Sequence, residues 1–272
     1  MPVSVRAVAF DLDDTLLRDD RSISPYTVRV LREARSRGIA VIPASGRARD
    51  SMRPFVEQLD CAELYIACNG AEVWSKEHDL LRRVTFPQET AEEIVRFADD
   101  NDCYAQTYDG AHFYYNREDD WAERYAESSM LTGLYTPQLN PFIAEHPTSK
   151  ILMMHEPVVI ARMLREARRI FAGRASVTCS KPYFLEFNPP GATKGEALAW
   201  CAERLGFPLR EAAAFGDSLN DLSMLETAGT GVCVANARDD VRARIRRVCR
   251  SNEEDGVARY IEEQFLRDAF PV

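Results

Sequence analysis

The chain has 272 residues, of which 46% are hydrophobic and 28% charged, and its formal net charge is −9. This acidic balance argues against nucleic acid or an anionic membrane as the main partner, although a bound divalent cation would still admit an anionic substrate. We find no repeat, no signal-peptide pattern and no apolar run near the ~18 residues of a membrane span. Seven cysteines without a CxxC pair favour a reduced, cytoplasmic setting.

The amino-terminal part of the chain alternates strands with helices. Three continuous apolar runs predict strands buried on both faces of a parallel sheet: residues 5–10, 39–44 and 63–68. The helix after the first run has clear limits, because Ser24 can cap it, Pro25 suits its first turn and Gly38 ends it. A second helix is expected at residues 47–59. This βαβαβ succession predicts right-handed crossovers in a parallel sheet.

The pattern changes between residues 81 and 187. A helix is expected around residues 87–100, and Asp109-Gly110 between two apolar runs predicts a hairpin. The remaining predicted elements are a helix at 118–129, an irregular stretch, a strand at 150–155, and then a helix and a strand. This segment is expected to form a separate α+β module with an antiparallel sheet.

After Pro189-Pro190-Gly191 the first pattern resumes. Thr193 and Glu196 form a capping-box pattern, which predicts a helix that Gly206 ends. Further elements follow: strands at 212–215 and 231–235, and helices at 222–228 and 253–267. We therefore predict an α/β fold with a doubly wound parallel-sheet core domain at residues 1–80 and 188–272 and an inserted α+β cap domain at 81–187. The two joints are hinge candidates.

Four short motifs fall at the carboxyl ends of predicted strands, where open α/β sheets bind ligands: DLDDT (11–15), ASGR (44–47), TKG (193–195) and GDSLND (216–221). Asp11 and Asp13 from one loop and Asp217 from another offer the hard oxygen ligands that suit Mg²⁺. Each motif alone has an ordinary alternative, such as a solvated loop for Asp11 and Asp13 or a helix cap for Asp217. All four together, in this order, point to a site.

Two polar residues in these motifs suit an anionic substrate. Ser45 and the backbone N–H groups beside Gly46 can hold a phosphoryl oxygen, although an ordinary turn serine is the simpler alternative. Lys194 is placed in the first turn of a helix, where the helix dipole disfavours a cation, and this predicts an anion nearby. A solvated lysine is the alternative there.

The set DLDDTLL, ASGR, TKGEAL and GDSLNDLSML resembles the haloacid dehalogenase superfamily of aspartate-nucleophile phosphohydrolases. The insertion point, NGA (69–71), FLEFNPPGATKG and SNEEDGVARYIEE are similar to the Cof-like subfamily, which carries an α/β cap. The resemblance spans nearly the whole chain. One departure is Asp14, where the family more often has glycine, and aspartate tolerates unusual turn dihedrals better than most residues.

The resemblance implies Mg²⁺-dependent hydrolysis of small phosphate monoesters. Sugar phosphates are the default class of this subfamily, and its range also includes pyridoxal phosphate, nucleotides and flavin mononucleotide. Asp11 would be the nucleophile that forms an aspartyl phosphate, and Asp13 the general acid and base. Metal ligands would come from Asp11, the Asp13 carbonyl and Asp217, with Asp221 orienting the loop or acting through water. Substrate or phosphate contacts would come from Ser45, Gly46, Arg47, Asn69, Gly70, Lys194 and Asn220. We expect a small-molecule partner, neither nucleic acid nor membrane, and a monomer or weak homo-oligomer.

Two other functions share parts of this pattern. A phosphomutase of the same capped fold would need a basic cluster in the cap, and the cap does contain basic residues: Arg117, Arg124, Lys150, Arg162, Arg165, Arg168, Arg169 and Lys181. A phosphoacceptor receiver domain also uses clustered aspartates, but it lacks an acid two residues after the nucleophile and a large insert. The aromatic cluster around the hairpin (Tyr104, Tyr108, Phe113, Tyr114 and Tyr115) can stack on a ring or belong to the core, and the core is the simpler expectation.

Overall fold

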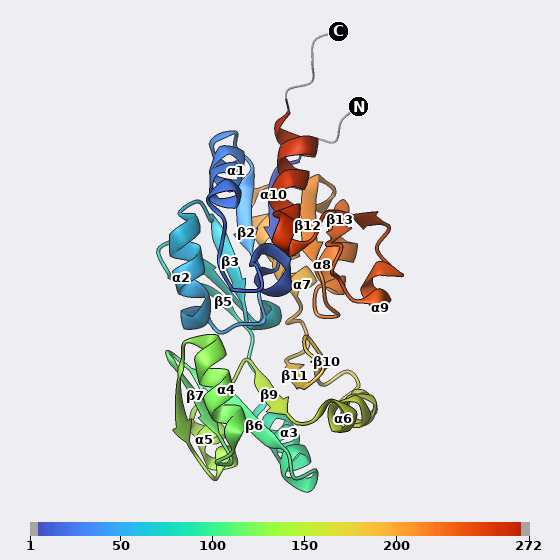
Figure 1. The fold of residues 1–272 in the computed structure, drawn as a ribbon. Helices are drawn as coiled ribbons and strands as arrows, with labels where there is room; N and C mark the ends of the chain where they lie inside the picture. Colours follow the sequence, from blue (N-terminus) through green and yellow to red (C-terminus); the bar gives the residue numbers. More distant parts are fainter. Residues whose placement is uncertain (1–4, 268–272) are drawn as a thin grey trace.

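The computed structural model describes residues 5–267. Figure 1 shows two parts joined by two passages of chain: the upper part contains both ends of the described chain, and the lower part comes from the middle of the sequence. The upper part has a parallel sheet covered by helices, and the lower part has a mainly antiparallel sheet. The predicted fold class, an α/β core with an inserted α+β cap, is confirmed.

Five parallel strands form the core sheet in the order β14-β13-β12-β1-β2. Their bounds are β1 Ala7–Phe10, β2 Ala40–Pro43, β12 Ala212–Gly216, β13 Thr230–Cys233 and β14 Arg247–Val248. β1 lies between β2 and β12, and all four of its side chains are fully buried. A central strand buried on both faces has room for apolar side chains only, so the first polar residue appears where β1 ends.

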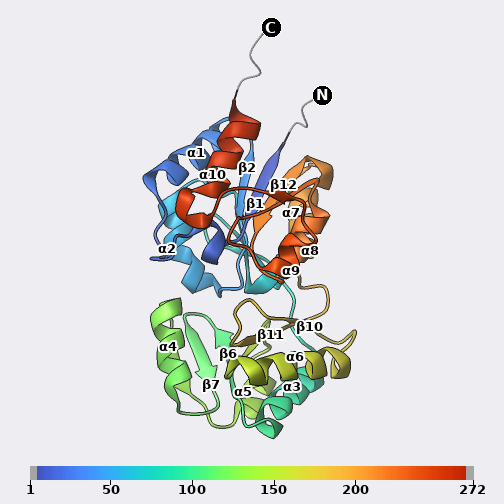
Figure 2. The ribbon, with the colours of Figure 1, turned by 45° about the vertical axis from the view of Figure 1, so that its right-hand side comes forward.

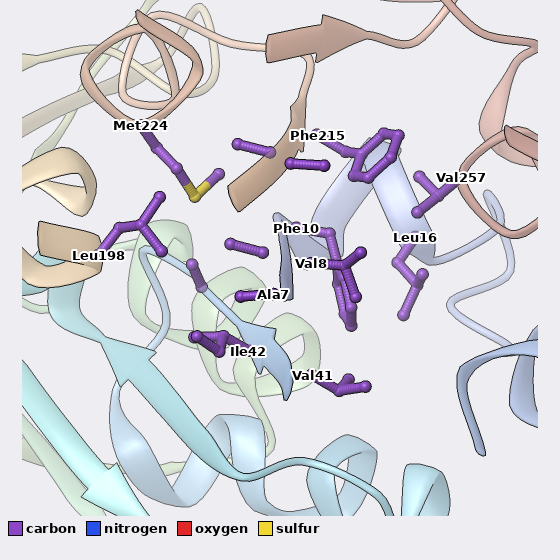
Figure 3. Close-up of a cluster of buried hydrophobic side chains, with 14 of the residues drawn as sticks. Ala7, Val8, Phe10, Leu16, Val41, Ile42, Leu198, Phe215, Met224 and Val257 are labelled. Atoms are coloured by element: carbon purple, nitrogen blue, oxygen red, sulfur yellow. The ribbon is translucent and has the colours of Figure 1, made fainter. Parts of the chain in front are cut away.

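Helices cover both faces of the core sheet. Their bounds are α1 Pro25–Ser36, α2 Arg49–Leu59, α7 Lys194–Leu205, α8 Leu222–Thr227, α9 Asp239–Arg242 and α10 Gly256–Ile261. α1 packs against α10 on one face, and α7 packs against α8 on the other (Figures 1 and 2). Figure 3 shows the result, with Leu198 and Met224 together on one side of the strands and Phe215 and Val257 on the other.

The predicted helix starts of the core are confirmed. The Ser24 hydroxyl accepts a hydrogen bond from the Thr27 N–H at 3.0 Å, and Pro25 occupies the first turn of α1. Thr193 and Glu196 form a reciprocal capping box at the start of α7. The carboxyl-terminal helix is less regular than predicted, because Asp255 has φ 56° and separates a short turn at Asn252–Glu254 from α10.

The third predicted core strand has a different main partner from the one expected. β3 (Leu64–Ala67) touches the core sheet through one isolated parallel bridge, Ile66 to Ala44, and Ala62 just before it forms a second with Val41. Its regular partner is the antiparallel strand β4 (Glu72–Ser75), which pairs in turn with β5 (Leu80–Arg83). Neither β4 nor β5 was predicted, because half-buried four-residue strands with charged residues lack a clear alternating pattern.

The cap is a six-stranded sheet in the order β10-β11-β9-β6-β7-β8. Its strands are β6 Tyr104–Asp109, β7 His112–Tyr115, β8 Thr132–Tyr135, β9 Ile151–Met154, β10 Ser176–Thr178 and β11 Phe184–Asn188. Its helices are α3 Gln88–Asp100, α4 Asp120–Ser129, α5 Leu139–Glu145 and α6 Pro157–Ile170. The predicted β6–β7 hairpin is confirmed.

Two features of the cap differ from the prediction. β7 and β8 are parallel rather than antiparallel, because α4 carries the chain back across before β8 begins. The stretch expected to be irregular contains β8 and α5. β8 was not predicted because it is an exposed edge strand of only four residues and contains Gly133, which weakens the strand pattern.

The chain passes between the two parts after β5 and again after β11. β5 pairs with β4, so strand pairing continues on the core side to Arg83, three residues past the proposed boundary at residue 80. β11 ends at Asn188, the proposed start of the second core segment. Among residues 5–267, no helix is both long and apolar enough to cross a membrane.

Candidate active site

The ends of β1, β2 and β12 meet because these strands are in parallel register. Phe10 lies between Pro43 of β2 and Phe215 of β12, so the residues that follow each strand emerge at one edge. A pocket of about 130 Å³ opens there between core and cap. Seven of the predicted site residues line it: Asp11, Asp13, Ser45, Gly46, Arg47, Asp217 and Asn220. Four others do not: Asn69, Gly70, Lys194 and Asp221.

A helical turn at Leu12–Leu16 returns the chain to the core directly after Asp11. Leu12, Leu16 and Leu17 are buried, and they anchor the turn on both sides of the two aspartates that follow Leu12. Asp14 has φ 58°, the left-handed conformation that glycine adopts most easily, and this explains why glycine is an alternative at this position. Its backbone carbonyl accepts a hydrogen bond from the Asn236 side chain at 2.7 Å.

Three buried carboxylates form the centre of the site. One oxygen from each of Asp11, Asp217 and Asp221 lies within 4.8 Å of the others. The ammonium of Lys194 donates to Asp11 at 2.5 Å and to Asp221 at 2.6 Å, and it is fully buried. The anions beside this lysine in the structure are therefore these two carboxylates, and Lys194 faces Asp11 and Asp221 without lining the pocket.

The carboxylate cluster carries more negative than positive charge, and this raises pKa values. Burial raises the pKa of Asp11 well above its ordinary value of 3.8; the charge of Lys194 opposes the rise, and the other two carboxylates add to it. Burial and the charge of Asp221 raise the pKa of Asp217 to about 7. Burial lowers the pKa of Lys194, but Asp11 and Asp221 outweigh it, so this lysine stays charged. A cation bound among the carboxylates would relieve the excess charge.

Asp221 holds the loop that carries Asp217. One oxygen of its carboxylate accepts from the backbone N–H groups of Asp217 and Ser218, each at 3.0 Å, and the other accepts from Lys194. Both oxygens therefore have partners within the protein, as both oxygens of Asp217 also have, and the two backbone contacts hold the Asp217 loop in place. Gly216 is required here, because a Cβ would lie 2.5 Å from the Cβ of Asp221.

Asp13 is paired with Arg47. The guanidinium donates to both carboxylate oxygens of Asp13, each at 2.7 Å, and also to Ser51 and to the Ser128 carbonyl of the cap. Burial raises the pKa of Asp13, but the hydrogen bonds and charge of Arg47 outweigh it, and the net pKa lies below 3.8. Arg47, predicted to contact substrate, is thus already engaged with the expected general acid.

Asn69 and Gly70 lie outside the pocket lining and contact other residues around the site. The Asn69 amide donates to Glu186 and Asn188 of the cap and accepts from Asn220 at 2.9 Å. Gly70 packs against the start of α7, where a Cβ would lie 2.1 Å from the Thr193 carbonyl oxygen. Both residues are buried outside the pocket lining, so their contacts are with protein groups.

A buried ion pair of the cap contacts the loop that carries Ser45 and Gly46, and the sequence did not place this pair in the site. The Lys150 ammonium donates to Glu186 and to the Gly46 carbonyl, both at 2.6 Å. Both side chains are almost fully buried, at 4% and 2% exposed. The sequence did hold a signal, because each charge adjoins or interrupts an apolar strand, in KILMM and FLEFN.

Two hydroxyl residues near Asp217 were also missed. Thr15 and Ser218 donate to its two carboxylate oxygens at 3.0 and 2.6 Å. Both belong to the predicted motifs, but hydroxyl residues in loops are too common to be singled out by sequence.

A family model described as haloacid dehalogenase-like hydrolase matches residues 8–261. The chain belongs to this family. It is 28% identical over 267 residues to the 5-amino-6-(5-phospho-D-ribitylamino)uracil phosphatase YcsE of Bacillus subtilis, with 97% of each chain covered. It is 28% identical to an HMP-PP phosphatase of Serratia proteamaculans, again with 97% of each covered.

Solved structures agree with this assignment. A haloacid dehalogenase-like hydrolase from Bacteroides thetaiotaomicron superposes with a TM-score of 0.83 at 28% identity, covering 96% of this chain and 100% of that one. The chain is therefore a phosphatase of the haloacid dehalogenase superfamily, and the Cof-like resemblance drawn from its motifs is confirmed.

Proposed function

We propose that this phosphatase hydrolyses small phosphate monoesters, with sugar phosphates as the expected class, through a phosphoryl group carried by Asp11 and with Mg²⁺ as cofactor. The observation that carries the proposal is the excess of buried carboxylates over cations at the end of β1 and β12, beside a pocket lined by Asp13 and Ser45. The names of the two relatives support a phosphate ester as the substrate.

The residues at the cluster fit Mg²⁺. Asp11 and Asp217 supply hard carboxylate oxygens, and the Asp13 carbonyl is the expected third ligand, with Asp221 fixing the loop. The side-chain oxygen of Asn220, buried at the pocket, has no hydrogen-bond partner among the described residues, which suits a water that Mg²⁺ retains. When bound, Mg²⁺ would offset the repulsion between the Asp11 carboxylate and an anionic ester.

In the proposed reaction, a carboxylate oxygen of Asp11 attacks phosphorus, and the bond from phosphorus to the leaving alcohol breaks. The alcohol oxygen takes a proton from Asp13. A water then attacks the phosphoryl group and gives its proton to Asp13, the bond to Asp11 breaks, and inorganic phosphate leaves. Lys194 holds the Asp11 carboxylate in place through its 2.5 Å contact, while Ser45 and the Gly46 backbone face the phosphoryl oxygens.

The acid role of Asp13 requires a change of partner. While Arg47 donates to both oxygens, Asp13 is held as a carboxylate, and its pKa is lowered. We propose that the leaving group displaces Arg47 from one oxygen and that this oxygen of Asp13 takes a proton from the solvent. The protonated Asp13 then faces the alcohol and gives it this proton, and the water that cleaves the intermediate returns one to Asp13. Arg47 stays tied to Ser128 of the cap and can then contact the substrate.

The described structure favours hydrolysis over mutase chemistry. Of the eight basic cap residues named from the sequence, only Lys150 and Lys181 line the pocket, and Lys150 is already paired with Glu186. Others are engaged elsewhere, such as Arg117 with Asp102 at 2.6 Å. A mutase needs a cationic cluster to hold a second phosphoryl group.

A reducing compartment such as the cytoplasm is part of the proposal. All seven cysteines are buried free thiols. Proteins of oxidising compartments usually join such residues in disulfides.

The proposal is tested with Asp11→Asn and a generic phosphate ester in the presence of Mg²⁺. We expect turnover to fall at least about a thousandfold, because the amide is not a nucleophile, and chelation to abolish wild-type turnover. Asp60→Asn is the matched control, since the Asp60 side chain is 80% exposed and outside the pocket lining, and it should leave the rate within about threefold. Equal turnover by Asp11→Asn and wild type would overturn the nucleophile assignment.

A further inference from the structure

A chain of hydrogen bonds runs through the interior of the cap and ends at the catalytic pocket. The Tyr104 hydroxyl donates to the side-chain oxygen of Gln106 at 2.7 Å, and the amide nitrogen of Gln106 donates to the Tyr108 hydroxyl at 2.8 Å. Tyr108 donates in turn to the Tyr125 hydroxyl at 2.8 Å. The first three residues belong to β6, whereas Tyr125 belongs to α4 and lines the pocket.

All four side chains of this chain are buried in the cap. Tyr104 is 1% exposed and Gln106 is fully buried, and Tyr108 and Tyr125 are buried as well. The burial of Tyr104, Tyr108 and Phe113 matches the simpler expectation that the hairpin aromatics belong to the core. A buried hydroxyl hydrogen without an acceptor is costly, so the direction in which the chain donates matters.

The closed end of the chain fixes that direction. Among residues 5–267, the Tyr104 hydroxyl has no acceptor other than Gln106, so it must donate there. If the chain ran the other way, Gln106 would donate to Tyr104, and the Tyr104 hydrogen would be buried without an acceptor. In the observed direction every hydroxyl hydrogen of the chain is used except the last one, on Tyr125.

The Tyr125 hydroxyl is therefore a donor whose own hydrogen is unused. It accepts from Tyr108, and no described residue accepts from it. Burial raises the pKa of Tyr125, and the opposing charges of Lys150 and Arg47 do not cancel the rise, so the hydroxyl keeps its hydrogen at neutral pH. The Phe113 ring packs edge-on against the Tyr125 ring, with centroids 5.1 Å apart, and this holds the hydroxyl in place.

This hydroxyl lies on the side of the pocket where the phosphoryl group is expected. The Lys150 ammonium donates to the Gly46 carbonyl and lies 5.8 Å from the centre of the Tyr108 ring. Because Tyr108 contacts Tyr125, the Tyr125 hydroxyl borders the loop of Ser45 and Gly46. In a pocket of only about 130 Å³, a group that this loop binds also meets the cap wall.

We propose that the Tyr125 hydroxyl donates a hydrogen bond to a phosphoryl oxygen of the bound ester, across the pocket from Ser45 and the Gly46 backbone. The inference rests on the proposed phosphatase function, in which the phosphoryl group is otherwise held by the core alone. Arg47 of the core donates to Ser128 of the same helix at 3.1 Å, so Tyr125 reaches the pocket while α4 lies against the core. The contact thus ties phosphate binding to the position of the cap.

The test measures the binding of inorganic phosphate to the Mg²⁺-loaded protein by calorimetry, and kcat/KM for ribose 5-phosphate and p-nitrophenyl phosphate. In Tyr125→Phe we expect the dissociation constant of phosphate to rise about tenfold, because a hydrogen bond to a charged oxygen is lost. The kcat/KM of both esters should fall by a similar factor, since they share the phosphoryl group. An unchanged phosphate affinity would overturn the proposal, as would a loss of kcat/KM with only one ester.

Two further variants separate this contact from support of the fold. Tyr65→Phe is the matched control, because Tyr65 is fully buried, its hydroxyl bonds Nδ1 of His78 at 2.8 Å, and it lies outside the pocket lining. It should leave phosphate binding within about twofold. Tyr108→Phe breaks the Tyr108–Tyr125 bond but leaves the Tyr125 hydrogen free, so it should bind phosphate at least about fivefold more tightly than Tyr125→Phe. Equal weakening by these two variants, in protein that circular dichroism shows to be folded, would mean that the chain only supports the cap and that the proposal is wrong.

These outcomes separate the Tyr125 contact from the function beneath it. Hydrolysis that depends on Asp11, with equal phosphate affinity in wild type and Tyr125→Phe, contradicts the contact alone. Phosphate binding that Tyr125→Phe weakens, without turnover of either ester by the wild type, contradicts the function alone. Absence of both turnover and phosphate binding in the wild type contradicts both.

Discussion

Each half of the site contains one buried lysine, and the two lysines differ in the number of carboxylates around them. Lys194 of the core contacts Asp11 and Asp221, with Asp217 in the same cluster. Lys150 of the cap contacts one carboxylate, Glu186, and a backbone carbonyl. The core cluster therefore keeps an excess of negative charge, whereas the cap pair is balanced.

The pKa values follow this difference. In the core, burial and the surplus carboxylates raise the pKa of Asp217 to about 7. In the cap, burial raises the pKa of Glu186, but Lys150 outweighs it, and the net pKa lies below its ordinary value of 4.5. The surplus of buried negative charge in the core suits a bound cation and catalysis. The balanced Lys150–Glu186 pair instead holds the cap against the Gly46 loop.

The largest effect is expected from removing the core cation. Lys194→Met leaves three buried carboxylates without their ammonium, so we expect kcat to fall by about a hundredfold to a thousandfold. Lys76→Met is the control, since Lys76 is a core-side lysine whose side chain is 58% exposed. Steady-state turnover of protein shown to be folded by circular dichroism decides the matter, and a loss below tenfold would contradict the account.

The cap lysine should affect stability more than chemistry. Lys150→Met strands a buried Glu186, and we expect the free energy of unfolding to drop by about 3–5 kcal/mol. Adding Glu186→Leu should restore part of it, because the lone charge is then gone. Since the folded pKa of Glu186 is depressed, the pair's contribution is present above pH 4.5 and is lost as pH falls below that value. Denaturant unfolding of both variants across this pH range measures both effects. If Lys150→Met alone is as stable as Lys76→Met, the stabilising role of the Lys150–Glu186 pair is contradicted.

The core cluster should show the opposite dependence on pH. Because the folded pKa of Asp217 is raised from 3.8 to about 7, its contribution to the stability of the metal-free protein falls as pH rises between these values. Mg²⁺ needs the carboxylate, so its affinity should weaken about tenfold per unit as pH falls below 7. Thermal shifts with Mg²⁺ at pH 6 and pH 8 test this, with Asp217→Asn expected to bind Mg²⁺ weakly at both. An equal Mg²⁺ shift at the two pH values would contradict it.

The contrast also explains what could be read from the sequence. The core half of the site follows strands of a parallel sheet, so short contiguous motifs mark its residues, and Asp11, Ser45 and Asp217 do line one pocket. Burial of β1 and the caps of α1 and α7 were predictable because they depend on neighbouring residues.

The cap half depends on contacts between residues far apart in the chain. Lys150 and Glu186 pair although they are 36 positions apart in sequence, and Trp121 stacks on Tyr183 from another distant segment. No local pattern encodes such pairs. The Arg47 contact with Asp13 could not be predicted either, because an arginine that follows a strand can pair with many different carboxylates.

The central claim is that Asp11 carries the phosphoryl group during turnover. The most direct measurement is mass spectrometry of peptides from Asp13→Asn enzyme quenched in acid during reaction with a phosphate ester, since loss of the base should slow hydrolysis of the intermediate. The account predicts one phosphoryl group on the peptide that contains Asp11, and none when Asp11→Asn is added. Phosphoryl transfer to another residue, or full turnover with no phosphorylated peptide, would contradict it.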